Sequence, residues 1–339
     1  MIYHNKKNIN NIINDDNIGN NNINTNNRTE KMAIKELIVK LENEYNMQYY
    51  DIKKLLKFCL KADDRYLIIH NNDKIDKGKQ KQIFLYANEI KNGVPIQYVI
   101  NEQDFMGQAF YVNENVLIPQ PDTEVVVQCA INKIKELMNT NNKNEPIKHN
   151  QIKVLDLCTG SGAIGISIKK YFGEYVNVTL SDISNKALDV AKINAKRILD
   201  NQNVTEQNSS KKIIKNNIFS IESNVNFLQS DMFQNVKGNF DIIVSNPPYI
   251  KSKLIDELDK DVKNEPHIAL DGGSDGLKFY KIIKSEINHF LNKNGYLILE
   301  IGYDQKEDVQ KMFENSKCIK DYAGNDRVII WRRWHDLFF

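Results

Sequence analysis

Residues 152–163, Ile-Lys-Val-Leu-Asp-Leu-Cys-Thr-Gly-Ser-Gly-Ala, decide the fold class of this chain. Ile152–Leu157 has the apolar character of a buried strand, a turn of small residues follows, and a helical pattern begins after Gly162. Glycine can take positive φ and lets a ligand approach the backbone, and a helix N-terminus favours an anionic group such as a carboxylate. The stretch therefore predicts a strand–turn–helix unit that binds a ligand. A dinucleotide is one candidate, although the spacing is not G-x-G-x-x-G.

Strand-like and helical segments alternate after this unit. This alternation predicts an α/β fold with a doubly wound, mainly parallel sheet and helices on both faces. An Asn- and Ser-rich stretch, residues 200–224, interrupts the pattern and is expected to be a low-complexity surface insertion. The further strand-like segments are 176–181, 225–228, 240–245 and 296–301, and the helical patterns are 163–171, 184–199 and 276–291.

The part of the chain before this domain has a different composition. Residues 1–30 are rich in asparagine and are expected to be disordered, because such a tail buries too little apolar surface to offset its ordering entropy. Residues 31–94 have helical periodicity and predict a small helical domain. Residues 95–118 predict a β-hairpin linker, and residues 119–339 hold the sheet domain. The β-rich pieces of the linker are 96–100, 105–112 and 116–118.

Composition argues against several classes of protein. The net charge of +2 over 339 residues is too balanced to indicate nucleic-acid binding by charge alone. The four cysteines form no C-x-x-C pair and the histidines have no ligand spacing, so we expect no metal site and no disulfide framework. No apolar run approaches the ~20 residues that span a bilayer. We expect a cytoplasmic protein, or an organellar one if the source is eukaryotic and the tail is a transit segment.

Two further motifs follow strands of the predicted sheet. Asp182 could accept hydrogen bonds from both ribose hydroxyls of a nucleoside, or could cap the helix that starts near Ser184. In the segment that begins at Ser230, Asp231 could meet the exocyclic amine of an adenine while Met232 or Phe233 covers its face. The alternative for that segment is a strand exit with two core residues.

The most specific motif is Asn246-Pro247-Pro248-Tyr249, at the end of a strand. The two prolines lack N–H donors and fix two φ angles, so the segment is stiff. The Asn246 side-chain oxygen and the Pro247 carbonyl can accept the two N–H bonds of one planar NH₂ group. An amide nitrogen is a poor nucleophile, and two fixed acceptors would hold it and favour the charge that develops during attack. Tyr249 could flank the planar group.

The order of these motifs resembles class I S-adenosylmethionine-dependent methyltransferases. Flanking segments resemble the HemK-type protein-glutamine methyltransferases, which modify the glutamine of the Gly-Gly-Gln tripeptide in peptide chain release factors. The resemblance covers residues 31–331. It is carried by Phe105-Met106-Gly107, by 116–124 (VLIPQPDTE), by Glu265-Pro266, by 269–276 (ALDGGSDG) and by 324–328 (GNDRV).

The resemblance implies a Rossmann-like, seven-stranded sheet, S-adenosylmethionine as the cofactor, and a monomer whose helical domain meets a release factor. Asn246 would contact cofactor and substrate, and with Pro247 and Tyr249 would form the catalytic group. Pro248 and Phe105 would complete the glutamine pocket. The cofactor would be bound by Cys158, Thr159, Gly160, Ser161, Gly162, Asp182, Met232 and Asn246.

Three positions depart from the family pattern. Gln120 stands where arginine is common, which puts a charge contact in doubt. Cys158 stands where glycine is common, so we expect this backbone position to need no positive φ. Met232 stands where some members have an aromatic residue, so we expect weaker stacking on adenine.

Other functions remain open at this point. The Asn-Pro-Pro-Tyr motif also suits enzymes that methylate an exocyclic amine of adenine, guanine or cytosine, for which a flipped base and phosphate contacts would be needed. A non-catalytic binding module and a dehydrogenase are more remote alternatives.

Overall fold

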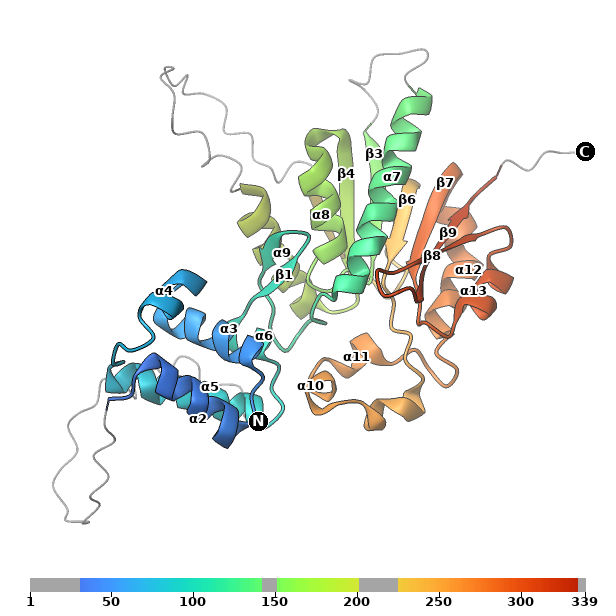
Figure 1. Ribbon diagram of the computed structural model, residues 1–339. Coiled ribbons are helices and arrows are strands. Elements are labelled where there is room, and N and C mark those ends of the chain that lie inside the picture. The colour runs from blue at the N-terminus through green and yellow to red at the C-terminus, as the bar shows by residue number, and fades with distance from the viewer. Residues whose placement is uncertain (1–30, 142–150, 201–224, 335–339) are drawn as a thin grey trace, which may run out of the picture. The chain divides into compact units, whose positions relative to one another are not determined.

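The computed structural model describes residues 31–141, 151–200 and 225–334, and the chain divides into two compact units, Met1–Ile100 and Asn101–Phe339 (Figure 1). The expectations for residues 1–30, and for all but the first residue of the 200–224 insertion, lie outside these ranges. Each unit has its own hydrophobic core.

The first unit is helical, as the periodicity predicts. Apolar residues three and four positions apart, such as Leu37 and Leu41, are fully buried in a common core. Asp63 and Asp76 cap two of the helices by accepting the backbone N–H of Tyr66 and Lys79 at 2.7 and 3.0 Å. The helices are α2 (Ile34–Tyr45), α3 (Tyr49–Leu60), α4 (Asp64–Ile69), α5 (Lys77–Lys91) and α6 (Ile96–Ile100).

Helix α6 corrects one expectation, because residues 96–100 had the composition of a strand. The carbonyl of Pro95 accepts the N–H groups of Tyr98 and Val99, so the proline begins this helix. Ile96 and Val99 are buried in the core of the unit. Packing of these β-branched side chains therefore outweighs their strand propensity.

The second unit begins with a hairpin, as predicted, but the expected strand piece 105–112 contains the turn and is not one strand. Strands β1 (Gln103–Phe105) and β2 (Gln108–Phe110) pair antiparallel across Met106 and Gly107, which both have positive φ, as a two-residue hairpin turn requires. The expected third piece, residues 116–118, is not a strand. The Ile118 N–H donates instead to the Glu265 carboxylate at 2.7 Å, so a side chain replaces the partner strand.

The described residues of the second unit form a seven-stranded sheet, which confirms the predicted fold class. Its order is β5-β4-β3-β6-β7-β9-β8, with the first five strands parallel and β9 antiparallel to both neighbours. The strands are β3 (Ile152–Leu157), β4 (Val176–Asp182), β5 (Val225–Gln229), β6 (Phe240–Ser245), β7 (Leu291–Glu300), β8 (Lys317–Lys320) and β9 (Asp326–Arg332).

Helices cover both faces of this sheet (Figure 1). Successive strand residues point to opposite faces, so Val154 belongs to the core beneath the green helices α7–α9 and Leu155 to the core beneath the red helices α12 and α13. The long helices are α7 (Glu124–Asn141), α8 (Ala163–Phe172), α9 (Asn185–Leu199), α12 (Lys278–Phe290) and α13 (Lys306–Met312). Short helices are η1 (Pro121–Thr123), η2 (Gly173–Tyr175), η5 (Ser252–Glu257), α10 (Lys260–Lys263) and α11 (His267–Leu270).

The chain order of the strands reverses between β3 and β6. From β3 the chain proceeds outward through β4 and β5, and then returns to the other side of β3 with β6. A crevice opens at the carboxyl ends of the strands at such a switch point. The predicted motifs follow β3, β4, β5 and β6, so they meet at this edge.

Candidate active site

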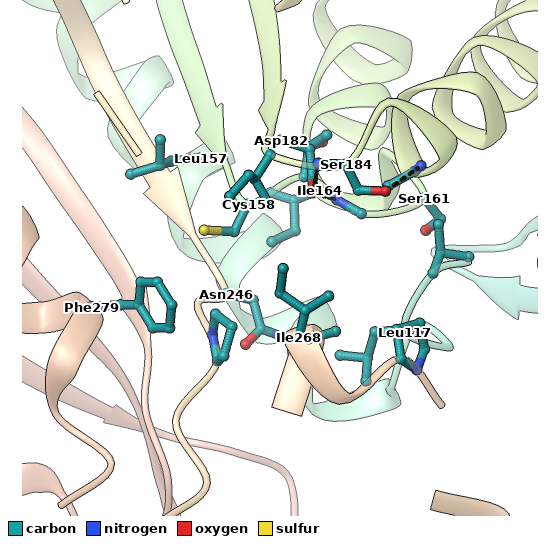
Figure 2. Close-up of a pocket in the computed structure, with 18 of the residues that line it drawn as sticks. Leu117, Leu157, Cys158, Ser161, Ile164, Asp182, Ser184, Asn246, Ile268 and Phe279 are labelled. Carbon is teal, nitrogen blue, oxygen red and sulfur yellow. Dashed lines mark hydrogen bonds between the residues drawn. The ribbon is translucent and has the colours of Figure 1, made fainter. Parts of the chain in front are cut away.

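A cavity of about 280 Å³ lies at this edge, within the second unit. Figure 2 shows Cys158, Ser161 and Asp182 on one side of it, with Asn246 and Ile268 across from them. Eight of the residues predicted for the site line this cavity, namely Cys158, Thr159, Gly160, Ser161, Asp182, Met232, Asn246 and Pro248. Four predicted residues do not line it, namely Phe105, Gly162, Pro247 and Tyr249.

The two glycines of the turn after β3 have different roles. Gly160 has a φ of 55° and open space where a Cβ would stand, so a ligand can approach its backbone. Gly162 has a φ of 83°, and a Cβ there would lie 2.5 Å from the Cδ1 of Ile166. Gly162 is therefore required by packing at the start of α8, and it lies outside the cavity lining.

The expectation that Cys158 needs no positive φ is wrong, because its φ is 60°. A side chain in this left-handed conformation costs roughly 1–2 kcal/mol. The half-buried Cys158 Sγ lies 3.8 Å from the sulfur of Met232, and both residues line the cavity. Burial raises the pKa of Cys158 well above its usual range, so the residue presents a neutral thiol to the cavity.

Asp182 connects two turns. Its Oδ2 accepts the Gly160 N–H and its Oδ1 accepts the Ser184 N–H, both at 2.9 Å. Ser184 is the residue that caps α9, by accepting the Ala187 N–H at 3.2 Å. Each carboxylate oxygen has a second lone pair. Asp182 can therefore accept hydroxyl groups from the cavity while it holds the turn, and binding of ribose stays a prediction.

Asp156 was not predicted as a site residue, but its side chain holds the turn after β3 by hydrogen bonds. It is fully buried, and its Oδ2 accepts the Thr159 hydroxyl at 2.6 Å and the Gly165 N–H at 2.9 Å. Burial raises the pKa of this carboxyl to about 7. A Cβ at Gly165 would lie 2.2 Å from Leu180, so α8 approaches the sheet closely here.

The segment after β5 contributes Asp231 and Met232 to the cavity. Met232 has a φ of 48° and is buried, while Asp231 is exposed. The Ser230 hydroxyl holds this turn by donating to the Met232 carbonyl at 2.8 Å. Phe233 does not face the cavity. Its ring stacks on Phe290 in the core at 4.8 Å between centroids, which leaves Met232 as the candidate to cover a flat ligand.

In the Asn-Pro-Pro-Tyr segment, Asn246 and Pro248 line the cavity. The Asn246 amide donates to the Thr123 hydroxyl at 3.3 Å, and its Oδ1 accepts no hydrogen bond from the described residues. Tyr249 was expected to flank a planar group, but its hydroxyl donates to the buried carboxylate of Glu300 at 3.4 Å. Its carbonyl accepts the Gln305 amide at 2.9 Å. Tyr249 therefore anchors the segment.

Loop 271–276 packs tightly against the same segment. A Cβ at Gly272 would lie 2.7 Å from the Cα of Tyr249, and one at Gly276 would lie 2.5 Å from its carbonyl oxygen. Gln305 joins the two pieces, because its amide also donates to the Gly276 carbonyl at 3.1 Å. The backbone that carries Asn246 is thus held on several sides.

Phe105 lies away from the cavity. It is 1% exposed and meets Phe110 edge to face at 5.8 Å, so it is a core residue of the hairpin.

Gln120, which stands where the family commonly has arginine, lines the cavity. Its side-chain amide donates to the Ile118 carbonyl at 3.1 Å.

Segment 118–124 is part of the stretch VLIPQPDTE that carries the family resemblance. Its side chains contact β9, the segment after β6 and the hairpin. Three successive side chains contact different parts of the domain. Asp122 pairs with Arg327 of β9 at 3.1 Å, Thr123 accepts the Asn246 amide, and Glu124 accepts the Met106 N–H at 2.7 Å. These contacts bring the strand ends and the hairpin to one wall of the site.

Within residues 31–141, 151–200 and 225–334, no helix is long and apolar enough to cross a membrane, and no cluster of three or more His, Cys, Asp or Glu residues could hold a metal ion.

Known proteins resemble the chain over most of its length. It is 37% identical to a protein of Clostridium acetobutylicum named release factor glutamine methyltransferase, over 88% of this chain and 98% of that protein. It is 31% identical to the Aquifex aeolicus protein of the same name, over 91% and 98%.

Two family models match parts of the chain. The model described as PrmC N-terminal domain matches residues 33–100, and that described as Eco57I restriction-modification methylase matches residues 176–302. Among solved structures, a methyltransferase from Pyrococcus furiosus has a TM-score of 0.42 at 16% identity, over 76% of this chain and 100% of that chain.

Proposed function

This chain belongs to the release factor glutamine methyltransferase family, and on that premise we propose that it transfers a methyl group from S-adenosylmethionine to the side-chain amide nitrogen of a release factor glutamine. The observation that carries the proposal is Asn246, whose Oδ1 accepts no hydrogen bond from the described residues and which lines a cavity across from the glycine-rich turn. The substrate glutamine is that of the Gly-Gly-Gln loop.

The residues around the cavity fit S-adenosylmethionine. The open backbone at Gly160 and the start of α8 suit its carboxylate. Asp182 suits the ribose hydroxyls, and Met232 suits the adenine face. The bound cofactor supplies an electrophilic methyl group on a sulfonium.

Asn246 and Pro247 act on the substrate amide. The Asn246 Oδ1 and the Pro247 carbonyl accept its two N–H bonds and hold the nitrogen in line with the methyl group. The same acceptors favour the positive charge that develops on the nitrogen. A strong general base is not needed, since the nitrogen becomes acidic as it is alkylated and loses its proton afterwards. Transfer is direct, without a covalent enzyme intermediate.

A nucleic-acid amine is the less favoured substrate. The model described as a restriction-modification methylase matches only residues 176–302, whereas the named protein-glutamine relatives match both units. The helical unit matches the model of a PrmC N-terminal domain.

Mass spectrometry of a methylation reaction tests the proposal. Purified protein and S-adenosylmethionine are incubated with a release factor, and in parallel with the same factor carrying Gln→Ala in its Gly-Gly-Gln loop. We expect one added methyl group on that glutamine and none on the control. Asn246→Ala should lower kcat by about 100-fold or more, because it removes an acceptor aligned with the transition state. Turnover that survives Asn246→Ala unchanged would contradict the mechanism.

A further inference from the structure

The cavity has one aromatic side chain on its wall. Among the described residues that line it, only Phe279 carries an aromatic ring and only Lys278 carries a positive charge. Both belong to the first turn of α12, outside the motifs predicted for the site. Figure 2 shows Phe279 on the side of the cavity where Leu157 lies, away from Leu117 and Ser161. This ring has no role in the mechanism described above.

Helix α12 turns one face to the core and another to the cavity. Tyr280, Ile283 and Ile287 are fully buried in the core. Phe279 and Ile282 are three positions apart, so they lie on one face of the helix, and both line the cavity. Their side chains are half-buried. The Phe279 ring is therefore open to a ligand, while the helix that carries it is packed on the sheet.

The backbone on either side of Phe279 is held in place. The Tyr280 hydroxyl donates to the Glu300 carbonyl at 3.0 Å, and the Lys278 N–H donates to the Gly272 carbonyl at 3.1 Å. A ring on such a fixed backbone loses little further entropy when a ligand packs against it.

One face of the ring is already covered. The Lys278 Nζ lies over Phe279, 5.1 Å from the ring centroid, which is within the range of a cation–π contact. A flat ligand in the cavity can therefore meet the other face or the edge of the ring. Aromatic groups prefer these offset-stacked and edge-to-face arrangements.

The surroundings of the ring indicate which part of S-adenosylmethionine it meets. Phe279 and Cys158 pack against the core cluster that contains Met232, whereas Ile164 of α8 belongs to the cluster on the other face of the sheet. The start of α8 suits the carboxylate of the cofactor, and Asp182 suits its ribose. The adenine is the part that remains for the side of the cavity that Met232 and Phe279 share.

An aromatic contact from α12 also fits the residue at position 232. Met232 stands where some members of the family have an aromatic residue, and a thioether gives an adaptable apolar contact without a ring. Phe279 supplies a ring from a different element of the fold.

We propose that Phe279 is a cofactor-binding residue whose ring packs against the adenine of S-adenosylmethionine. The inference rests on the proposed function for the identity of the cofactor. It adds a contact from α12 to those of the turns that follow β3, β4 and β5.

Calorimetric titration with S-adenosylhomocysteine, the demethylated cofactor, tests the inference. Phe279→Leu keeps an apolar side chain and removes the ring, so we expect Kd to rise about fivefold. Phe279→Tyr keeps the ring and should bind as the wild type does. The unfolding midpoint of each variant without ligand should stay near that of the wild type.

Phe84→Leu is the matched control. Phe84 of α5 is half-buried, and the Lys40 Nζ lies over its ring at 5.2 Å from the centroid, but it does not line the cavity. The Kd of this variant for S-adenosylhomocysteine should be unchanged. An equal rise of Kd in Phe84→Leu and Phe279→Leu would count against a direct contact.

A fragment of the cofactor shows which part the ring meets. 5′-Methylthioadenosine keeps the adenine and the ribose and lacks the amino-acid part. We expect Phe279→Leu to weaken its binding by the same factor as that of S-adenosylhomocysteine. Unchanged affinity for both compounds, a loss for S-adenosylhomocysteine alone, or a tyrosine variant as weak as the leucine variant would each overturn the inference. A higher KM for the release factor with unchanged cofactor affinity would assign the ring to the substrate instead.

An NMR measurement detects the contact itself. In deuterated protein with protonated phenylalanine rings, bound S-adenosylhomocysteine should show nuclear Overhauser effects between its adenine protons and a ring whose signals are missing in Phe279→Leu. Their absence in the wild type would refute the inference.

These binding measurements need no release factor, so they separate the inference from the proposed function. A wild-type protein that binds S-adenosylhomocysteine through Phe279 and methylates no release factor would contradict the proposed function alone. Methylation of a release factor, with cofactor binding that does not depend on Phe279, would contradict the inference alone.

Discussion

Cys158 shows how a single residue is strained at the cavity. Its φ of 60° is one that glycine adopts freely. The Sγ contact with Met232 accompanies this conformation.

Because of this strain, the glycine variant at position 158 should be more stable than the alanine variant, which is the reverse of the usual order in a helix. We expect Cys158→Gly to be more stable than Cys158→Ala by about 1 kcal/mol, because only glycine relieves the left-handed backbone. Cys129 is the control, since it is buried in helix α7. There glycine should be less stable than alanine by about 1 kcal/mol. Chemical denaturation of the four variants measures both differences, and the same order at both positions would contradict the strain.

Local sequence predicted the residues that follow strand ends, and it failed where the direction of a side chain depends on distant packing. The turn after β3, Asp182, Met232 and Asn246 do meet at one cavity. Tyr249 instead turns toward Glu300, which lies 51 positions later in the chain. No local pattern signals such a partner.

At the scale of elements, Asn194 of α9 joins three pieces of the fold. It is fully buried. Its Oδ1 accepts the Tyr111 N–H at 2.6 Å, and its amide donates to the carbonyls of Tyr111 and Ser161, both at 2.9 Å. The segment after the hairpin and the glycine-rich turn are thus attached to one helix.

Replacing Asn194 should loosen both attachments. We expect Asn194→Leu to lower the free energy of unfolding by about 3 kcal/mol, since buried backbone groups lose their partners. Affinity for S-adenosylmethionine should fall as well, because Ser161 lines the cavity. Asn185→Leu, at the exposed start of the same helix, should change neither quantity much. Urea unfolding and calorimetric titration measure the two effects, and equal losses in both variants would argue against this role.

The elements differ in how well their sequence predicts them. Strands β3 to β6 are apolar runs bounded by turns, so they were found with small errors at their ends. For β7 (Leu291–Glu300) only the apolar second half was expected, because its first five residues are mainly polar. Strand β8 has the sequence Lys-Cys-Ile-Lys and lies at the sheet edge, half-exposed, so it has no apolar run to detect. Helix α6 was missed because burial decides its conformation.

At the scale of the whole molecule, buried carboxyl groups should make stability depend on pH. Burial raises the pKa values of Asp156, Glu265 and Glu300 to about 7 each. Their ordinary values are 3.8 for aspartate and 4.5 for glutamate. Between those values and pH 7 the folded state binds more protons than the unfolded state, so the free energy of unfolding should fall as pH rises.

Unfolding at pH 5.0 and at pH 7.5 measures this fall. It should amount to a few kcal/mol, because a carboxyl group whose pKa is one pH unit higher in the folded state than in the unfolded state contributes about 1.4 kcal/mol. Glu265→Gln should reduce the fall, since glutamine can still accept the Ile118 N–H and carries no charge. Glu114→Gln, at an exposed position, should not. Stability that rises over this range would show that these carboxyls are not protonated in the fold.

The contact between Asp122 and Arg327 also affects the order in which the wall of the cavity forms during synthesis of the chain. A ribosome makes the helical unit, η1 and the first parallel strands long before it reaches β9. The contact between Ile118 and Glu265 likewise spans 147 positions. Until β9 emerges, Asp122 of segment 118–124 lacks its Arg327 partner. A nascent chain therefore completes this wall of the cavity only after β9 has left the ribosome, more than 200 positions after segment 118–124.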